Sequence, residues 1–162
     1  MLENQDISLQ LYEPKYKAKL AKFYLTDEQK RYTTIPIEAL EKCTEDPTGR
    51  PIVVLSGEVP VGFFILHTGE GIHEFTENPQ AMLLRAFCIN HRYQGRKYAA
   101  RALSVLPPFA QKYFPDKKEI ILAVNKDNEP AKGLYGKVGF HNTGAEKIGR
   151  SGPMHIYSYT LS

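Results

Sequence analysis

The strongest constraint on this chain is a buried strand that continues through a basic glycine loop into a helix and then a second buried strand. Residues 82–89 (MLLRAFCI) are largely apolar, and His91 to Leu103 (HRYQGRKYAARAL) crowds positive charge around Gly95. Residues 119–124 (EIILAV) form another short apolar run. Such runs are typical of strands covered on both faces. The spacing is that of one crossover connection, so we expect these two strands to be parallel.

The other segments predict a mixed sheet flanked by helices. Alternating polarity predicts a strand over 7–12, and two apolar runs within 51–69, separated by SGEVP, predict a hairpin. Helical spacing and capping signals predict helices within 13–25, 26–33, 35–46, 99–113 and 125–140, and a last strand is expected over 154–161. Pro107 and Pro108 should kink or split their helix near Leu106, because together they remove two backbone donors. We therefore predict a mixed α/β (α+β) fold with a mostly antiparallel sheet, one parallel central pair, and helices on both faces.

Length and cysteine content limit the classes to which the chain can belong. Its 162 residues suit a single domain, 1–162, with a sizeable core. Residues 1–10 show neither the basic start nor the apolar run of a signal peptide, and no apolar stretch is long enough to cross a bilayer. Only Cys43 and Cys88 are present, so no disulfide framework is implied and we expect a cytoplasmic protein. Cys88 lies in an apolar run and is predicted to be a buried thiol.

Charge and histidine spacing argue against two further classes of partner. His67, His73 and His91 lack the spacing of metal ligands, so no metal is expected. A net charge of +3, with no stripe in which basic and aromatic residues alternate, is weak support for nucleic-acid binding. We therefore expect no metal, no nucleic-acid partner and no membrane partner.

The basic loop has the features of an anion-binding site. A helix that begins after Gly95 offers free backbone N–H groups and the positive end of its dipole, and glycine lets a phosphate approach the backbone closely. Arg92, Arg96 and Lys97 add charge around it. The Walker A and GxGxxG phosphate loops are absent, which leaves a loop of the type QxxGx[G/A], here QGRKYA. A solvated basic turn is the alternative explanation for this stretch alone.

Two motifs in the same order and spacing resemble the GNAT family of N-acetyltransferases. Residues 83–103 look like the family's fourth strand, pyrophosphate loop and third helix. Residues 125–140 (NKDNEPAKGLYGKVGF) resemble its NxxAxxLYxxxGF segment, with Asn128, Tyr135 and Gly139 in register. The resemblance is clear over residues 81–140. It departs from the family pattern at Lys97, where glycine is preferred.

The resemblance implies a GNAT-like fold in which the fourth and fifth strands splay apart to hold acetyl-CoA as co-substrate. Tyr135 would be the catalytic residue that protonates the leaving thiolate, although a tyrosine on an apolar helix stripe also suits packing alone. The residues that the resemblance assigns to acetyl-CoA are Phe87, Cys88 and Ile89 through their backbones, Gln94, Gly95, Arg96, Lys97, Tyr98 and Ala99 around the pyrophosphate, and Asn128 at the pantetheine.

The acceptor is not identified by the sequence. We expect an N-acetyltransferase that modifies a primary amine of a small molecule, peptide or protein, with a non-catalytic acyl-CoA-binding sensor module as the alternative function and a homodimer as one option for assembly. Tyr24, Tyr32 and Arg85 are candidate acceptor-binding residues. Polyamine-type members often carry an acidic residue where Arg85 stands, which argues against a simple polyamine. A structural ion pair between Arg85 and a carboxylate of the 70–77 loop is the competing hypothesis.

Overall fold

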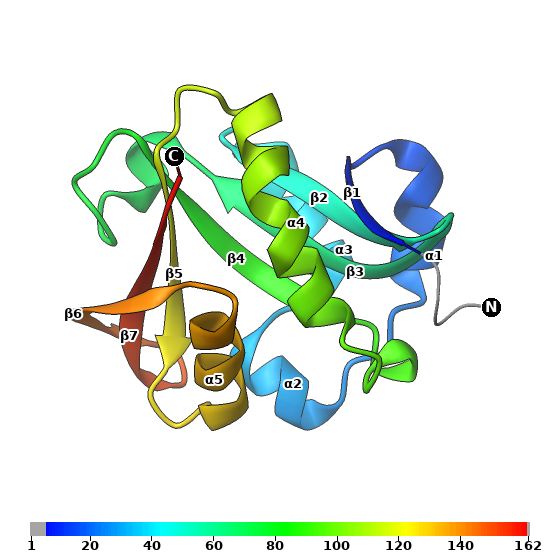
Figure 1. Ribbon diagram of the computed structural model, residues 1–162. Coiled ribbons are helices and arrows are strands. Elements are labelled where there is room, and N and C mark those ends of the chain that lie inside the picture. The colour runs from blue at the N-terminus through cyan, green and yellow to red at the C-terminus, as the bar shows by residue number, and fades with distance from the viewer. Residues whose placement is uncertain (1–5, 162) are drawn as a thin grey trace.

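A computed structural model describes residues 6–161, apart from the side chain of Glu70, as a sheet with helices on both faces (Figure 1). The strands are β1 (Ile7–Leu11), β2 (Gly49–Ser56), β3 (Val59–His67), β4 (Ala81–Ile89), β5 (Glu119–Asn125), β6 (His141–Gly149) and β7 (Gly152–Thr160). The α-helices are α1 (Lys17–Ala21), α2 (Asp27–Tyr32), α3 (Pro36–Glu45), α4 (Tyr98–Tyr113) and α5 (Glu129–Lys137). Short 3-10 helices are η2 (Pro14–Tyr16), η3 (Gly69–Ile72) and η4 (His91–Tyr93).

The predicted mixed sheet is confirmed. The described strands form one seven-stranded sheet in the order β1-β2-β3-β4-β5-β7-β6. Every neighbouring pair is antiparallel except β4 and β5, which run parallel and are joined through α4. The parallel pair therefore lies in the middle of the sheet, where the apolar runs 82–89 and 119–124 predicted it.

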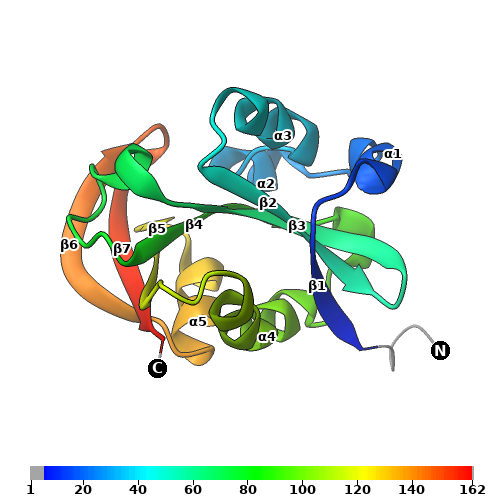
Figure 2. The same cartoon turned by 90° about the horizontal axis from the view of Figure 1, so that it is seen from above.

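Helices cover the two faces of the sheet unequally. In Figure 2, α1, α2 and α3 lie on one face, and α4 and α5 lie on the other. The larger core lies beneath α4, where Leu103 and Leu106 pack with Leu84 of β4 and Leu122 of β5. A second cluster packs α1 and α3 against the opposite face, and a third, smaller cluster around Ile121 lies on that opposite face next to it. Each face is thus held by its own apolar layer.

A bulge in β4 changes which side chains share a face. Ala86 has a positive φ of 57°, and the register of β3 with β4 shifts between Phe63 and Ile65. Simple alternation would place Arg85 with Phe87 and Ile89. Beyond the bulge the alternation restarts, so Phe87 packs in the core beneath α4 while Ala86 packs in the cluster on the opposite face. Arg85 and Phe87 therefore lie on opposite faces, contrary to what the alternation of side chains along an unbroken strand predicts.

One other local prediction differs from the structure, and one strand was not predicted. α4 is one continuous helix through Pro107 and Pro108, so the predicted split does not occur. Leu106 before the prolines and Phe109 after them are both buried in the same core, so packing holds the helix on either side of the prolines. Strand β6 was not predicted, since its residues are polar and largely exposed and show no alternation. It forms as an edge strand paired to β7.

Candidate functional site

The parallel pair β4–β5 opens at the centre of the sheet. Its ladder runs from Ala81–Glu119 to Leu83–Ile121 and ends there, although both strands continue. Beyond that point β4 pairs only with β3, up to the match of Ile89 with Gly62. A cavity of about 800 Å³ lies where the strands diverge, with residues 87–89 and 123–125 among its walls. Diverging strands leave backbone groups there that a ligand can use.

Most of the predicted acetyl-CoA residues line this cavity. Nine of the ten lie in its wall, and Tyr135 lies there with them. Arg96 is the tenth; its side chain is exposed, with its guanidinium carbon 5.7 Å from the centre of the Tyr93 ring. The lining residues from the prediction are Phe87, Cys88, Ile89, Gln94, Gly95, Lys97, Tyr98, Ala99, Asn128 and Tyr135.

The glycine loop turns sharply into the first turn of α4. Gly95 has a φ of 83°, and Lys97, the N-cap residue, has a φ of 62° in the left-handed region. The Lys97 side chain makes no capping hydrogen bond to the first turn of α4, and a helix N-terminus is where backbone N–H groups lack partners within the helix. The side chain of Tyr98 turns the other way, into the core, with its hydroxyl 3.4 Å from the Ser56 Oγ. Backbone, charge and dipole together make this a place for an anion.

Helix α5 presents Asn128 and Tyr135 to the cavity. The Asn128 Oδ1 accepts a hydrogen bond from the Ala131 N–H at 3.4 Å, so this side chain is also the N-cap of α5. The ring of Tyr135 meets that of Phe140 edge-on, with the centroids 5.8 Å apart. Burial raises the pKa of the Tyr135 hydroxyl above its ordinary value, which keeps the proton on the oxygen at neutral pH. A hydroxyl held protonated in a cavity can act as a proton donor.

Helix α2 forms part of the cavity wall, a position that the sequence did not reveal. Thr26, the N-cap residue of α2, forms a capping box with Gln29, whose backbone N–H donates to the Thr26 Oγ1 at 3.2 Å. The Gln29 Nε2 donates to the carbonyl of Ile89 at 3.1 Å, and the Gln94 Nε2 donates to the same carbonyl at 3.4 Å. The T-x-x-Q pattern signalled the cap, but no local signal indicated the contact with β4. The Ile89 carbonyl is thus already occupied by protein donors.

An ion pair and hydrogen bonds hold the other end of α2 beside the cavity. Arg31 forms an exposed ion pair with Asp127 at 2.9 Å, and the Tyr32 hydroxyl donates to the same carboxylate at 3.1 Å. Arg150 donates to the carbonyl of Thr33 at 3.2 Å. The segments that follow β5 and β6 therefore hold the end of α2 beside the carboxyl end of β5.

Of the three predicted acceptor residues, only Tyr32 lines the cavity. Tyr24 is 60% exposed and packs edge-on against His91. Arg85 is also exposed and lies outside the cavity wall, where its Nη1 is 3.1 Å from the His67 Nδ1. Because a guanidinium only donates, His67 accepts at Nδ1 and carries its proton on Nε2, which lies 2.9 Å from the Asp46 Oδ2. Arg85 is thus linked to a carboxylate of the α3–β2 turn through a histidine.

Among the described side chains, no ion pair joins Arg85 to a carboxylate of the 70–77 loop. Glu74 of that loop pairs with Lys147 at 3.2 Å, and Glu70 lies outside the described side chains.

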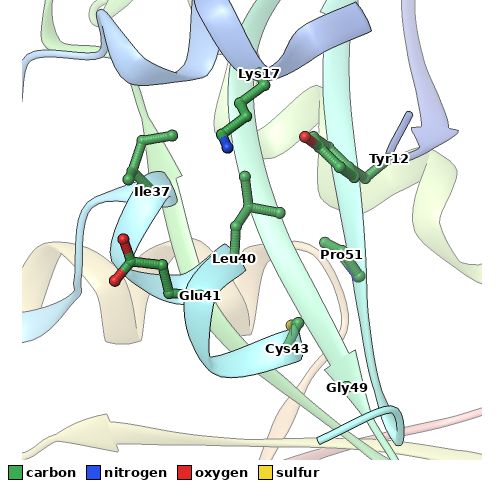
Figure 3. Close-up of a pocket in the computed structure, with 8 residues that line it drawn as sticks. All are labelled: Tyr12, Lys17, Ile37, Leu40, Glu41, Cys43, Gly49 and Pro51. Atoms are coloured by element: carbon green, nitrogen blue, oxygen red, sulfur yellow. The ribbon is translucent and has the colours of Figure 1, made fainter. Parts of the chain in front are cut away.

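A smaller cavity of about 280 Å³ lies on the α1–α3 face, where Lys17 of α1 meets Leu40 and Glu41 of α3 (Figure 3). None of the predicted site residues lines it. Within residues 6–161, no cluster of three or more His, Cys, Asp or Glu side chains is placed to hold a metal ion. In the same range, no helix has the length and apolar character needed to cross a membrane.

Comparison with known proteins places this architecture. A sequence model described as Acetyltransferase (GNAT) family matches residues 17–140. An uncharacterized N-acetyltransferase of Bacillus subtilis (strain 168), YbbJ, is 41% identical over 158 residues, covering 97% of this chain and 99% of the relative.

Solved structures share the fold. AAC(6')-Ib, solved with paromomycin and acetyl-CoA, superposes with a TM-score of 0.77 at 16% identity, over 96% of this chain and 93% of the other. Spermidine N-acetyltransferase from Vibrio cholerae, solved with CoA and spermine, has a TM-score of 0.72 at 16% identity, over 96% of each chain. At this level of identity the likeness is one of fold.

Proposed function

Because this chain belongs to the GNAT family of acetyltransferases, we propose that it transfers the acetyl group of acetyl-CoA to a primary amine of a small molecule or peptide. The observation that carries the proposal is the opening between β4 and β5, where the ladder ends at Leu83–Ile121 and the cavity begins. The anion-binding loop lies at one end of that opening and a protonated tyrosine lies in its wall. This arrangement supports an enzyme over the sensor module, because a sensor needs no proton donor.

The cavity suits a ligand with an anionic end and a long polar arm. Its volume of about 800 Å³ is in the range of small-molecule sites. The first turn of α4, with Gly95 and Lys97, would bind the pyrophosphate through backbone N–H groups and charge. Backbone groups of residues 87–89 on the open edge of β4, other than the Ile89 carbonyl that Gln29 and Gln94 already occupy, would hold the pantetheine arm, with Asn128 on the opposite wall.

The chain's own residues then provide position and one proton. Acetyl-CoA supplies an activated acetyl group, which is attacked by the lone pair of the amine. The walls from β4 and β5 hold the two reactants together, an effect that by itself lowers the barrier strongly. Tyr135 donates its hydroxyl proton to the departing sulfur as the carbon–sulfur bond breaks. The nitrogen that has formed the amide bond releases one proton to solvent and Tyr135 regains one, so the products are the N-acetylated amine and the CoA thiol.

Two measurements test this function. Acetyl-CoA at about a hundredfold excess over its Kd should stabilise the protein by about 2.7 kcal/mol, which raises Tm by roughly 5–10 °C for a chain of this size. Tyr135→Phe should reduce turnover by roughly ten- to a thousandfold with little change in acetyl-CoA affinity. Tyr113→Phe, at a 42% exposed tyrosine on α4, is the matched control and should not reduce turnover. No thermal shift at saturating acetyl-CoA would refute the proposal, whereas full turnover in Tyr135→Phe with chemistry limiting would show that Tyr135 only packs.

A further inference from the structure

Two polar atoms in the cavity wall lack hydrogen-bond partners among the described residues. Asn125, the last residue of β5, is 7% exposed, and its Nδ2 is buried without a partner. The Oγ1 of Thr33, just beyond α2, is also buried and unpaired. Both residues line the same cavity. A buried donor without a partner is destabilising and is rare in folded proteins, so each of these atoms needs an explanation.

Both atoms lie on the side of the sheet away from the glycine loop. Along β5, Leu122 and Val124 pack in the core beneath α4, whereas Ile121 and Ala123 pack on the opposite face. Since side chains alternate, Asn125 points to the same face as Ile121 and Ala123. Figure 2 shows that this face carries α2, and the glycine loop leads into α4 on the other.

Asn125 and Thr33 are also near each other in the fold. Tyr32, next to Thr33, donates to Asp127, two residues after Asn125. An amide whose nitrogen has no partner can turn about χ2 and direct an N–H into the cavity, and a threonine hydroxyl can rotate in the same way. The acceptor side of the cavity thus offers one amide donor and one hydroxyl, with the exposed carboxylate of Glu28 also in its wall.

We propose that Asn125, with Thr33 beside it, binds an oxygen of the acceptor, so that the substrate is an amine that carries a hydrogen-bond-accepting oxygen in the part that enters the cavity. This inference rests on the proposed function. Glu28 attracts the positively charged amine, and Asn125 distinguishes it from a plain polyamine. A polyamine has no oxygen to accept from Asn125, so its entry would leave that donor unpaired in a cavity from which it displaces water.

The first experiment compares two isosteric amines. In 2-propoxyethylamine one ether oxygen replaces a methylene of hexylamine, so the pair differs only in the acceptor atom. We expect kcat/KM to be about tenfold higher for the ether amine, as one neutral hydrogen bond allows. Asn125→Leu should bring the ratio of the two values close to one. Equal values in the wild type, a ratio unaffected by Asn125→Leu, or a preference for spermidine over the ether amine would overturn the proposal.

The second experiment needs no substrate. Asn90 is another buried asparagine, 5% exposed, but its Oδ1 accepts from the backbone N–H of Tyr24 at 3.1 Å. Asn90→Leu should therefore lower Tm, whereas Asn125→Leu should leave Tm unchanged or raise it, since it removes an unpaired donor. A fall in Tm for Asn125→Leu as large as for Asn90→Leu would show a structural role and overturn the proposal.

Thr33→Val provides an independent variant should Asn125→Leu fail to fold. Its matched control is Thr143→Val, because the Thr143 Oγ1 donates to the carbonyl of Ile156 at 2.8 Å and is satisfied. Only the control should lower Tm. If neither amine is acetylated by a protein that binds acetyl-CoA, these melting temperatures decide the matter. A protein that neither binds acetyl-CoA nor acetylates any amine refutes the proposed function itself, whereas equal acetylation of hexylamine and the ether amine refutes only this inference.

Discussion

Gly62 is the position where a single methyl group should affect both stability and the site. This glycine of β3 lies opposite Ile89 of β4, and a Cβ added to it would lie 2.7 Å from the Ile89 Cδ1, 3.0 Å from the Cys88 carbonyl oxygen and 3.1 Å from the Val54 Cβ. The Ile89 methyl is the end of a side chain, but it is buried in the core and has little room to move. The carbonyl is backbone, so Gly62→Ala must push β4 away from β3.

The expected cost of Gly62→Ala follows from that overlap. Overpacking a filled core costs about 1–3 kcal/mol, and the gain from restricting the unfolded chain offsets part of it. A net loss of about 1–2 kcal/mol lowers Tm by roughly 2–8 °C. Because Cys88 and Ile89 form the wall of the cavity, their displacement should also lower kcat/KM by several-fold to about tenfold, given that a 1 Å misplacement can cost about 10².

Gly133→Ala is the matched control for Gly62→Ala. A Cβ at Gly133, in α5, meets nothing within 4 Å, so the same substitution there should raise stability by about 0.5–1 kcal/mol. Melting curves and acetyl-transfer rates of both variants measure the contrast. If Gly62→Ala melts at the wild-type temperature with full activity, the close approach of β3 to β4 does not constrain the site.

Three further predictions concern single side chains. Burial raises the pKa of Cys88 to about 12, so this thiol should resist alkylation by iodoacetamide at pH 8 in the native protein and react only after unfolding, as mass spectrometry can show. Lys97→Gly should raise Tm, since a left-handed residue with a Cβ costs roughly 1–2 kcal/mol that glycine avoids; an unchanged or lower Tm contradicts this. The hydrogen bonds from Thr48 lower the pKa of Asp46, so they stabilise the fold above the unfolded pKa of about 3.9 and cease to do so as pH falls through the folded value. Thr48→Val should therefore lower Tm at pH 7 but much less at pH 3, and an equal loss at both pH values would contradict the assignment.

The central unit of the fold could be predicted because its signals are local. A few consecutive residues are enough to predict each of its parts: the run 82–89, the loop around Gly95, the helix after it and the run 119–124. These parts form β4, α4 and β5 with the loop between them. β6 could not be found in this way. Its side chains are exposed, so no buried face imposes a pattern on the sequence, and the strand forms only because β7 offers a partner.

The site residues likewise fall into those with a local sequence signal and those without one. The glycine loop and the Asn128–Tyr135 segment are contiguous motifs, and the resemblance placed nearly all of them in the cavity wall. The position of α2 at the cavity was not predicted, because the hydrogen bond that joins it to β4 runs from Gln29 to Ile89, 60 residues apart. Nothing in the pattern of either segment depends on the other, so the contact follows only from the assembled fold.

The prediction for Arg85 shows most clearly where pattern rules stop. Alternation along a strand holds only while every residue advances the chain by the same step, and Ala86 breaks that step with a positive φ. The break moves Arg85 off the face of Phe87 and out of the cavity wall, beside His67. Alanine gains nothing locally from a left-handed conformation, so neither its identity nor its neighbours indicate the bulge in the sequence.

The strain at Ala86 is found where β4 leaves β5, which is also where the cavity opens, and this fits the tendency of backbone strain to concentrate at functional sites. Ala86→Gly should therefore relieve strain and raise Tm. If the bulge serves to aim residues 87–89, the added freedom should at the same time weaken acetyl-CoA binding, and a variant that is more stable and binds acetyl-CoA equally well would show that the bulge only accommodates packing.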